Sequence, residues 1–143
     1  MPIEVRALDD RRALPIDEVV GLYAAVGWTA YTRDPAVIAA GLRGAGFVAT
    51  ARLDGRLVGL VRAVSDDATI SYVQDVLVHP EAQRRGVGAA LMAAVADRYA
   101  HVRQHVLLTD DEPGQRAFYE SLGYAEVRDH GSGTLRAFVR FDG

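Results

Sequence analysis

The residues best suited to chemistry lie at positions 83 to 89, where the sequence reads Gln-Arg-Arg-Gly-Val-Gly-Ala. They follow Ile70–Val78, an apolar and β-branched run that is typical of a strand buried on both faces. They open a helical pattern in which apolar residues recur from Val87 to Tyr99. A glycine-bearing loop at a helix N-terminus leaves backbone N–H groups free and directs the positive end of the helix dipole at one point. With Arg84 and Arg85 beside it, this segment is expected to bind an anion, most simply a phosphate or pyrophosphate.

Two common phosphate loops do not fit this spacing. The dinucleotide fingerprint G-x-G-x-x-G differs from the glycine positions here, and the Walker-type loop needs a lysine, which the chain lacks. The dipeptide Asp54-Gly55 is a strong hairpin signal directly before the strand that leads to the loop. A doubly wound nucleotide-binding protein would place a parallel βα unit there, so this class is disfavoured.

The elements that must position the loop can be placed from hydrophobic period and turn residues. Helices are expected from Leu14 to Val26, Pro35 to Leu42, Gly88 to Tyr99 and Gln115 to Leu122. Strands are expected at Ile3–Ala7, Phe47–Leu53, Arg56–Val64, Ile70–Val78, His105–Thr109, Tyr124–Arg128 and Thr134–Phe141. The order is β-α-α-β-β-β-α-β-α-β-β, which predicts an α/β (α+β) domain with a mostly antiparallel sheet. The fourth and fifth strands, joined through a helix, are expected to be parallel.

Composition limits the function classes. A chain of 143 residues is expected to form one domain over residues 1–143, and it has no cysteine for disulfides or thiolate zinc sites. Its net charge of −3 argues against a nucleic-acid surface. The four histidines lack metal-ligand spacing, so no metal is expected. No signal peptide or long apolar run appears, which favours a cytoplasmic protein that does not engage a membrane.

Two motifs resemble those of one family. Gln83-x-x-Gly86-x-Gly88, after an apolar strand, is similar to the pyrophosphate loop of the GNAT superfamily of acyl-CoA N-acyltransferases. The segment from Ala117 to Tyr124 (AFYESLGY) resembles that family's A-x-x-[FL]-Y-x-x-x-G-[FY] signature. The order of elements is that of a whole GNAT domain, so the resemblance covers essentially the full chain.

The resemblance implies acetyl-CoA as co-substrate and a splay between the fourth and fifth strands, where its pantetheine arm enters. Val76 and Val78 would offer backbone hydrogen bonds to that arm, much as a partner strand adds to a sheet edge. Tyr119 matches the family tyrosine that acts as general acid toward the CoA sulfur. Homodimers are frequent in the family, so a homodimer is expected. The residues implied in holding the pyrophosphate are Gln83, Arg84, Arg85, Gly86, Val87, Gly88 and Ala89.

The resemblance implies fewer residues for the binding of the acceptor amine. Tyr72 and Gln74 occupy strand positions that face the acceptor in the family, and Trp28 and Tyr31 lie in the link that covers it. Neither Tyr72 nor Gln74 is a good base near neutral pH, since Gln does not titrate and Tyr has an ordinary pKa of about 10. Strand alternation predicts that the nearest carboxylate, Asp75, lies on the opposite face from Gln74 and is a structural partner. The general base therefore stays unassigned.

Three functions remain open. The first is an acetyl-CoA-dependent N-acetyltransferase that acts on a primary amine of a small molecule by direct attack. The second is an N-acetyltransferase for a protein or peptide. The third is a non-catalytic module that binds acyl-CoA as a sensor; the motif around Tyr119 argues against it, whereas the missing base leaves it open.

Overall fold

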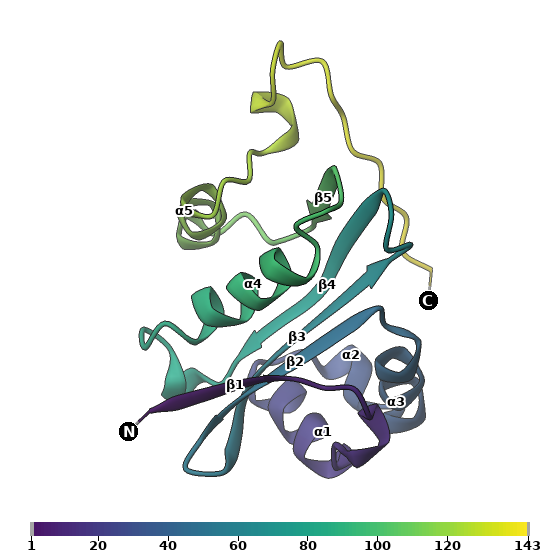
Figure 1. Ribbon diagram of the computed structural model, residues 1–143, viewed down its shortest axis with the longest axis vertical. Coiled ribbons are helices and arrows are strands. Elements are labelled where there is room, and N and C mark those ends of the chain that lie inside the picture. The colour runs from purple at the N-terminus through teal and green to yellow at the C-terminus, as the bar shows by residue number, and fades with distance from the viewer. Residues whose placement is uncertain (1, 143) are drawn as a thin grey trace. The chain divides into compact units, whose positions relative to one another are not determined.

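A five-stranded sheet is the centre of the fold, with α1–α3 on one face and α4 on the other (Figure 1). The structure, a computed structural model, describes residues 2–142 and divides into one unit that ends at Leu108 and a second that begins at Thr109. The strands, in sheet order, are β1 (Ile3–Ala7), β2 (Phe47–Leu53), β3 (Arg56–Ser65), β4 (Ile70–Val78) and β5 (Gln104–Leu107). β1 to β4 pair antiparallel, whereas β5 pairs parallel with β4. This arrangement confirms the predicted α/β class and the parallel fourth and fifth strands.

The hairpin between β2 and β3 forms where the sequence predicts it. Asp54 and Gly55 both have positive φ, at 53° and 78°, as a two-residue hairpin turn of type I′ requires. The following turn is closed by Asp66, whose Oδ1 accepts from the backbone N–H groups of Thr69, at 2.7 Å, and Ile70, at 3.1 Å. These turns place β4 in the interior of the sheet, between β3 and β5.

The helices of one face are α1 (Ile16–Ala25), α2 (Thr29–Thr32) and α3 (Pro35–Gly44). Asp34 caps α3 by accepting from the N–H of Ala36 at 3.2 Å, with Pro35 in the first turn, as the sequence predicts. The one-turn helix α2 lies within the segment that was expected to be a plain link. The core under these helices is aliphatic apart from Tyr23 and is made by Val19, Leu22, Tyr23, Ile38, Leu42, Val48, Leu60 and Leu77.

The opposite face is covered by α4 (Val87–Arg98), which packs very closely on β3. A Cβ atom at Gly59 would lie 2.7 Å from Cγ1 of Val87 and 3.1 Å from Cδ1 of Leu91. Only a residue without a side chain therefore allows α4 to approach β3 this closely. The N-terminal end of α4 is fixed against the sheet by this contact.

The second unit contains α5 (Pro113–Ser121) and a 3₁₀ turn at Val127–Asp129. The strands predicted at Tyr124–Arg128 and Thr134–Phe141 are not present among the described residues, so this part of the prediction is wrong. The apolar side chains that suggested the second of them are exposed, Phe138 by 94% and Phe141 by 86%. A strand persists only when a neighbour satisfies its backbone groups, and no ladder pairs with these residues. β5 also ends two residues before the predicted Thr109.

Candidate acetyl-CoA and amine site

The pairing between β4 and β5 stops halfway along β4. The register runs from Ile70 opposite Gln104 to Val73 opposite Leu107, where β5 ends, while β4 continues to Val78. At the same place β4 carries a bulge toward its other neighbour, because Ala63 lies opposite Val73 and Arg62 opposite Asp75, which leaves Gln74 as the extra residue. The second half of β4 is thus paired on one side only within the sheet.

The backbone of this half of β4 presents hydrogen-bonding groups at regular intervals. The N–H of His79 donates to the carbonyl of Val58 at 2.8 Å, so in this antiparallel ladder Leu77 and Asp75 also bond toward β3. Val76 and Val78 therefore turn their N–H and C=O groups toward the side of β5, beyond the point where β5 ends. These are the two residues that the sequence analysis expected to meet the pantetheine arm.

The loop before α4 adopts an unusual backbone. Arg84 and Gly86 have φ of 64° and 80°, in the left-handed region, and Gly86 is the N-cap residue of α4 without a side chain to cap it. The first intrahelical bond of α4 runs from the N–H of Ala90 to the carbonyl of Gly86 at 3.0 Å. The N–H groups of Val87, Gly88 and Ala89 consequently have no acceptor within the helix.

Space and charge around the loop suit an anion. A Cβ atom at Gly86 would have no heavy atom within 4 Å, so the space beside this N-cap residue is open. The side chains of Gln83, Arg84 and Arg85 are exposed, whereas that of Val87 is buried against β3. The side chain of Val87 thus packs in the core while its backbone N–H stays available. With this N–H and the exposed arginines, the loop suits the phosphate groups of a coenzyme.

On the face covered by α1 and α2, Tyr31 lies close to Tyr72 and Gln74, whereas Trp28, the fourth residue predicted to meet the acceptor, is linked to them through Tyr23. The Nε2 amide of Gln74 donates to the hydroxyl of Tyr31 at 3.2 Å. Partial burial raises the pKa of Tyr72, and the nearby Tyr31 and Asp75 add to the shift. Tyr31 and Trp28 both pack on Tyr23, with ring centroids 5.4 and 6.2 Å away.

Asp75 is the buried centre of this face. Its Oδ2 accepts from the hydroxyl of Tyr23 at 2.6 Å and from Nε of Arg62 at 2.8 Å, and its side chain is 1% exposed. Burial and then the adjacent carboxylate raise the pKa of Tyr23 well above its ordinary value, so this phenol stays protonated. Burial opposes the charge of Arg62, but Asp75 more than compensates, and the pKa of Arg62 is raised. Asp75 is therefore a structural partner, as predicted.

The prediction that Asp75 and Gln74 lie on opposite faces is wrong. Asp75 bonds to Tyr23 of α1 and Gln74 to Tyr31 of α2, two helices that cover the same face (Figure 1). The cause is the bulge, since its extra residue breaks strand alternation at this point. Sequence reasoning also missed Arg62 and Tyr23. Arg62 could have been found as the one charge inside a buried strand, at a position where the hairpin register brings it near Asp75.

Tyr119 lies in α5, in the second unit. Its ring contacts those of Phe118 and Tyr124 edge-on, with centroids 5.0 and 6.0 Å away. Burial raises the pKa of Tyr119, and Tyr124 and Asp110 raise it further. The phenol therefore carries its proton at neutral pH, the state that a general acid needs.

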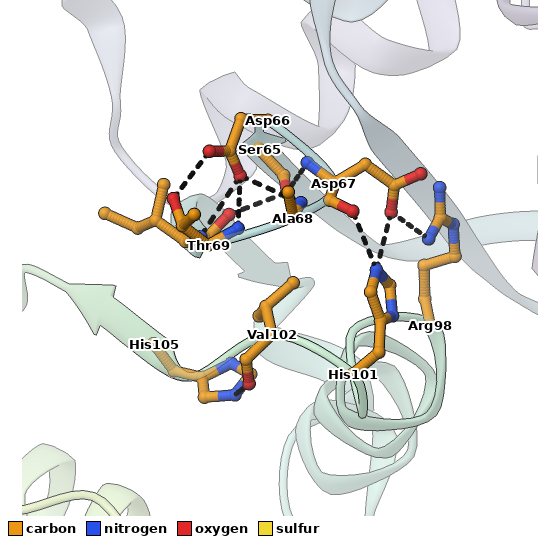
Figure 2. A network of polar contacts seen from close by, with 10 residues as sticks. Ser65, Asp66, Asp67, Ala68, Thr69, Arg98, His101, Val102 and His105 are labelled. Carbon is orange, nitrogen blue, oxygen red and sulfur yellow. Dashed lines mark hydrogen bonds and ion pairs between the residues drawn. The ribbon is translucent and has the colours of Figure 1, made fainter.

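Three of the four histidines are engaged by protein groups. Figure 2 shows His101 and Arg98 around Asp67, whose Oδ1 lies 2.9 and 2.8 Å from their nitrogens. Nδ1 of His105 lies 2.8 Å from Oγ of Ser71, and Nδ1 of His79 accepts from the N–H of Glu81 at 3.1 Å. Within residues 2–142 no group of three or more potential ligands could hold a metal ion. Over the same residues no helix has the length and apolar character to span a membrane.

The family model described as "Acetyltransferase (GNAT) domain" matches residues 43–126, more than half of the chain. These residues include the half-paired strand β4, the loop before α4 and Tyr119. The chain therefore belongs to the GNAT family of acetyltransferases.

Relatives by sequence are named acetyltransferases, and solved structures share the fold. The uncharacterized N-acetyltransferase ycf52 of Porphyra purpurea is 31% identical over 74 residues, which are 52% of this chain and 42% of that protein. The match thus spans less than half the length of the relative. A GNAT-family acetyltransferase from Streptococcus pneumoniae TIGR4 has the same fold, with a TM-score of 0.83 at 23% identity over 99% of this chain and 98% of that one. A ribosomal-protein-alanine N-acetyltransferase from Brucella melitensis biovar Abortus 2308 gives 0.69 at 24% identity, over 98% and 100%.

Proposed function

We propose that this protein is an acetyl-CoA-dependent N-acetyltransferase that acetylates a primary amine of a small molecule by direct attack. One observation carries the proposal. β4 loses its β5 partner at Val73 and runs on with Val76 and Val78 turned to the unpaired side, while the chain then leads into an open helix terminus with free N–H groups. An extended pantetheine arm that ends in a pyrophosphate has the matching shape and charge.

In this proposal acetyl-CoA is held mainly by backbone. The pyrophosphate would accept hydrogen bonds from the N–H groups of Val87, Gly88 and Ala89 and face the charges of Arg84 and Arg85, with Gln83 and Gly86 completing the loop. The amides of the arm would pair with Val76 and Val78 as an added strand does. Because the side chains of these valines stay in the sheet, binding would require no rearrangement of the core.

The chemistry follows from the bonds that change. The neutral amine attacks the thioester carbonyl, the N–C bond forms, the C–S bond breaks, and the ammonium loses a proton. We assign Tyr119 as the general acid that gives its proton to the departing thiolate. Asp75 is not the base, because its Oδ2 is taken by Tyr23 and Arg62 and it is buried. The amine would enter neutral or release its proton to water, and positioning would supply much of the rate.

We also propose that both units belong to one acetyltransferase domain, since the family match at residues 43–126 runs across the boundary at Leu108. The homodimer that the family resemblance implies stays a prediction.

The test is thiol release from acetyl-CoA in the presence of a panel of polyamines, amino sugars, amino acids, aryl amines and short peptides. Release with a small amine is expected. Release with peptides alone would replace the small acceptor by a protein, whereas calorimetric CoA binding without release from any acceptor would favour the acyl-CoA sensor.

A further inference from the structure

Three aromatic residues and one amide lie at or near the bulge of β4, with Trp28 linked to it through Tyr23, and we call them the aromatic wall: Trp28, Tyr31, Tyr72 and Gln74. The wall has two sides. Trp28 and Tyr31 come from the α2 segment, whereas Tyr72 and Gln74 come from β4. The hydrogen bond between Gln74 and Tyr31 at 3.2 Å joins the two sides.

The wall is held rigidly from behind. Tyr23 is 1% exposed and is fixed by its hydrogen bond to Asp75 at 2.6 Å. Tyr31 packs on it edge-on at 5.4 Å, and Trp28 at 6.2 Å. Trp28 nevertheless keeps 38% of its surface exposed, and Tyr31, Tyr72 and Gln74 are only half-buried. The rings are thus fixed in position by the core and keep free surface on which a ligand can stack.

The charges around the wall favour some amines over others. Asp75 is the carboxylate on this part of β4, and it is buried and paired with Arg62 at 2.8 Å. An amine at the wall would thus meet ring faces and an amide, with its single cation attracted by the rings. The additional ammonium groups of a polycation would lose water against the rings, and the carboxylate of Asp75 is already engaged by Tyr23 and Arg62.

The wall lies where β4 loses its pairing with β5, which is where the proposed pantetheine site begins. Gln74 is the bulge residue directly after Val73, the last residue of β4 that pairs with β5. Resting on the proposed function, we infer that the acceptor is a monoamine with an aromatic or flat apolar body, which stacks on Tyr31, Tyr72 and Trp28. Polyamines and amino sugars are then poor acceptors.

The chain has a single tryptophan, Trp28, so its fluorescence reports on the wall alone. The experiment titrates the full-length protein, with coenzyme A present, with phenethylamine, hexylamine or spermidine, and follows emission at an excitation where phenethylamine does not absorb. We expect phenethylamine to change Trp28 emission and to bind about tenfold more tightly than the other two, as one or two aromatic contacts would give. No change with phenethylamine, or tighter binding of spermidine, would overturn the inference.

Two matched variants locate the effect. Tyr72→Phe keeps the ring and is expected to keep phenethylamine affinity, whereas Tyr72→Leu is expected to lose about tenfold, with a smaller loss of hexylamine affinity. Equal affinities for the two variants, once circular dichroism shows both folded, would contradict stacking on Tyr72.

Thiol release distinguishes this inference from the proposed function. Faster acetyl transfer to hexylamine or spermidine than to phenethylamine would leave the transferase standing and overturn the aromatic acceptor. Absence of calorimetric CoA binding by the folded wild-type protein would instead overturn the transferase, and with it the inference.

Discussion

Asp75 shows how one buried residue can organise the face of the sheet under α1 and α2. Its carboxylate joins β3 to β4 through Arg62 and joins the sheet to α1 through Tyr23. Such a buried group is tolerated because both partners satisfy it, and the removal of one partner leaves a charge without compensation. The network therefore connects the stability of the fold with the placement of the aromatic wall.

Replacement of Arg62 by Met is expected to cost about 3–5 kcal/mol of unfolding free energy, because Asp75 would stay buried without its cation. Urea unfolding measures the change. Arg52→Met is the matched control, since Arg52 also pairs with a carboxylate, Glu18, at 2.8 Å, but in a more exposed place. Screening by water limits that pair to less than about 1 kcal/mol. Equal losses for the two variants would show that the buried network has no special weight.

Tyr119→Phe is expected to lower kcat by about 10²–10⁴-fold, because the leaving thiolate loses its proposed general acid, while affinity for acetyl-CoA changes little. Since the pKa of Tyr119 is raised, the acid stays protonated through neutral pH, and wild-type kcat should fall only above about pH 10. Steady-state kinetics over a pH series test this. Tyr124→Phe, which alters the neighbouring phenol, is the control. Turnover of Tyr119→Phe equal to that of the wild type at every pH would remove Tyr119 from the mechanism.

At the scale of elements, the close packing of α4 on β3 holds the loop before α4 in place. Gly59→Val is expected to destabilise the protein by about 1–3 kcal/mol, because the new side chain would overlap Val87 and Leu91. Gly21→Ala, in the middle of α1 with nothing within 4 Å, should instead stabilise by about 0.5–1 kcal/mol. Thermal and urea unfolding of both variants measure the difference, and a neutral Gly59→Val would mean that α4 can shift away from the sheet.

The loop itself is tested by Gly86→Glu, which would place a negative side chain before the free N–H groups of α4. Calorimetry should show no CoA binding. Gly55→Glu is the matched control, because Gly55 has a similar φ of 78° against 80° and equally open surroundings, but lies in the β2–β3 hairpin. It should bind CoA like the wild type. Retained binding by folded Gly86→Glu would contradict the pyrophosphate assignment.

The elements also show how far sequence reasoning reaches. Local signals were sufficient for the hairpin at Asp54-Gly55, the capped start of α3 and the open loop before α4, because turn chemistry and helix capping depend on neighbouring residues. The bulge at Gln74 has no such signal, because an extra residue is defined only by the register of the partner strand. The expected strands near the C-terminus failed for a related reason, since alternating apolar residues specify a strand only where another strand is available.

At the scale of the whole molecule, the family match joins residues that lie in both units. It begins at Arg43, near the end of α3, and ends at Glu126, beyond α5. The backbone that would hold acetyl-CoA belongs to the first unit, whereas the proposed general acid belongs to the second. The proposed function thus draws on residues of both units.

The most direct test of the transferase is thiol release from acetyl-CoA by the purified chain, measured with and without an amine panel beside the Gly86→Glu variant. We predict amine-dependent release by the wild type and none by Gly86→Glu. Mass spectrometry should then identify an acetylated amine in equal amount to the free CoA. Amine-dependent release that persists in Gly86→Glu, or no release with any acceptor despite a folded protein, would contradict the account.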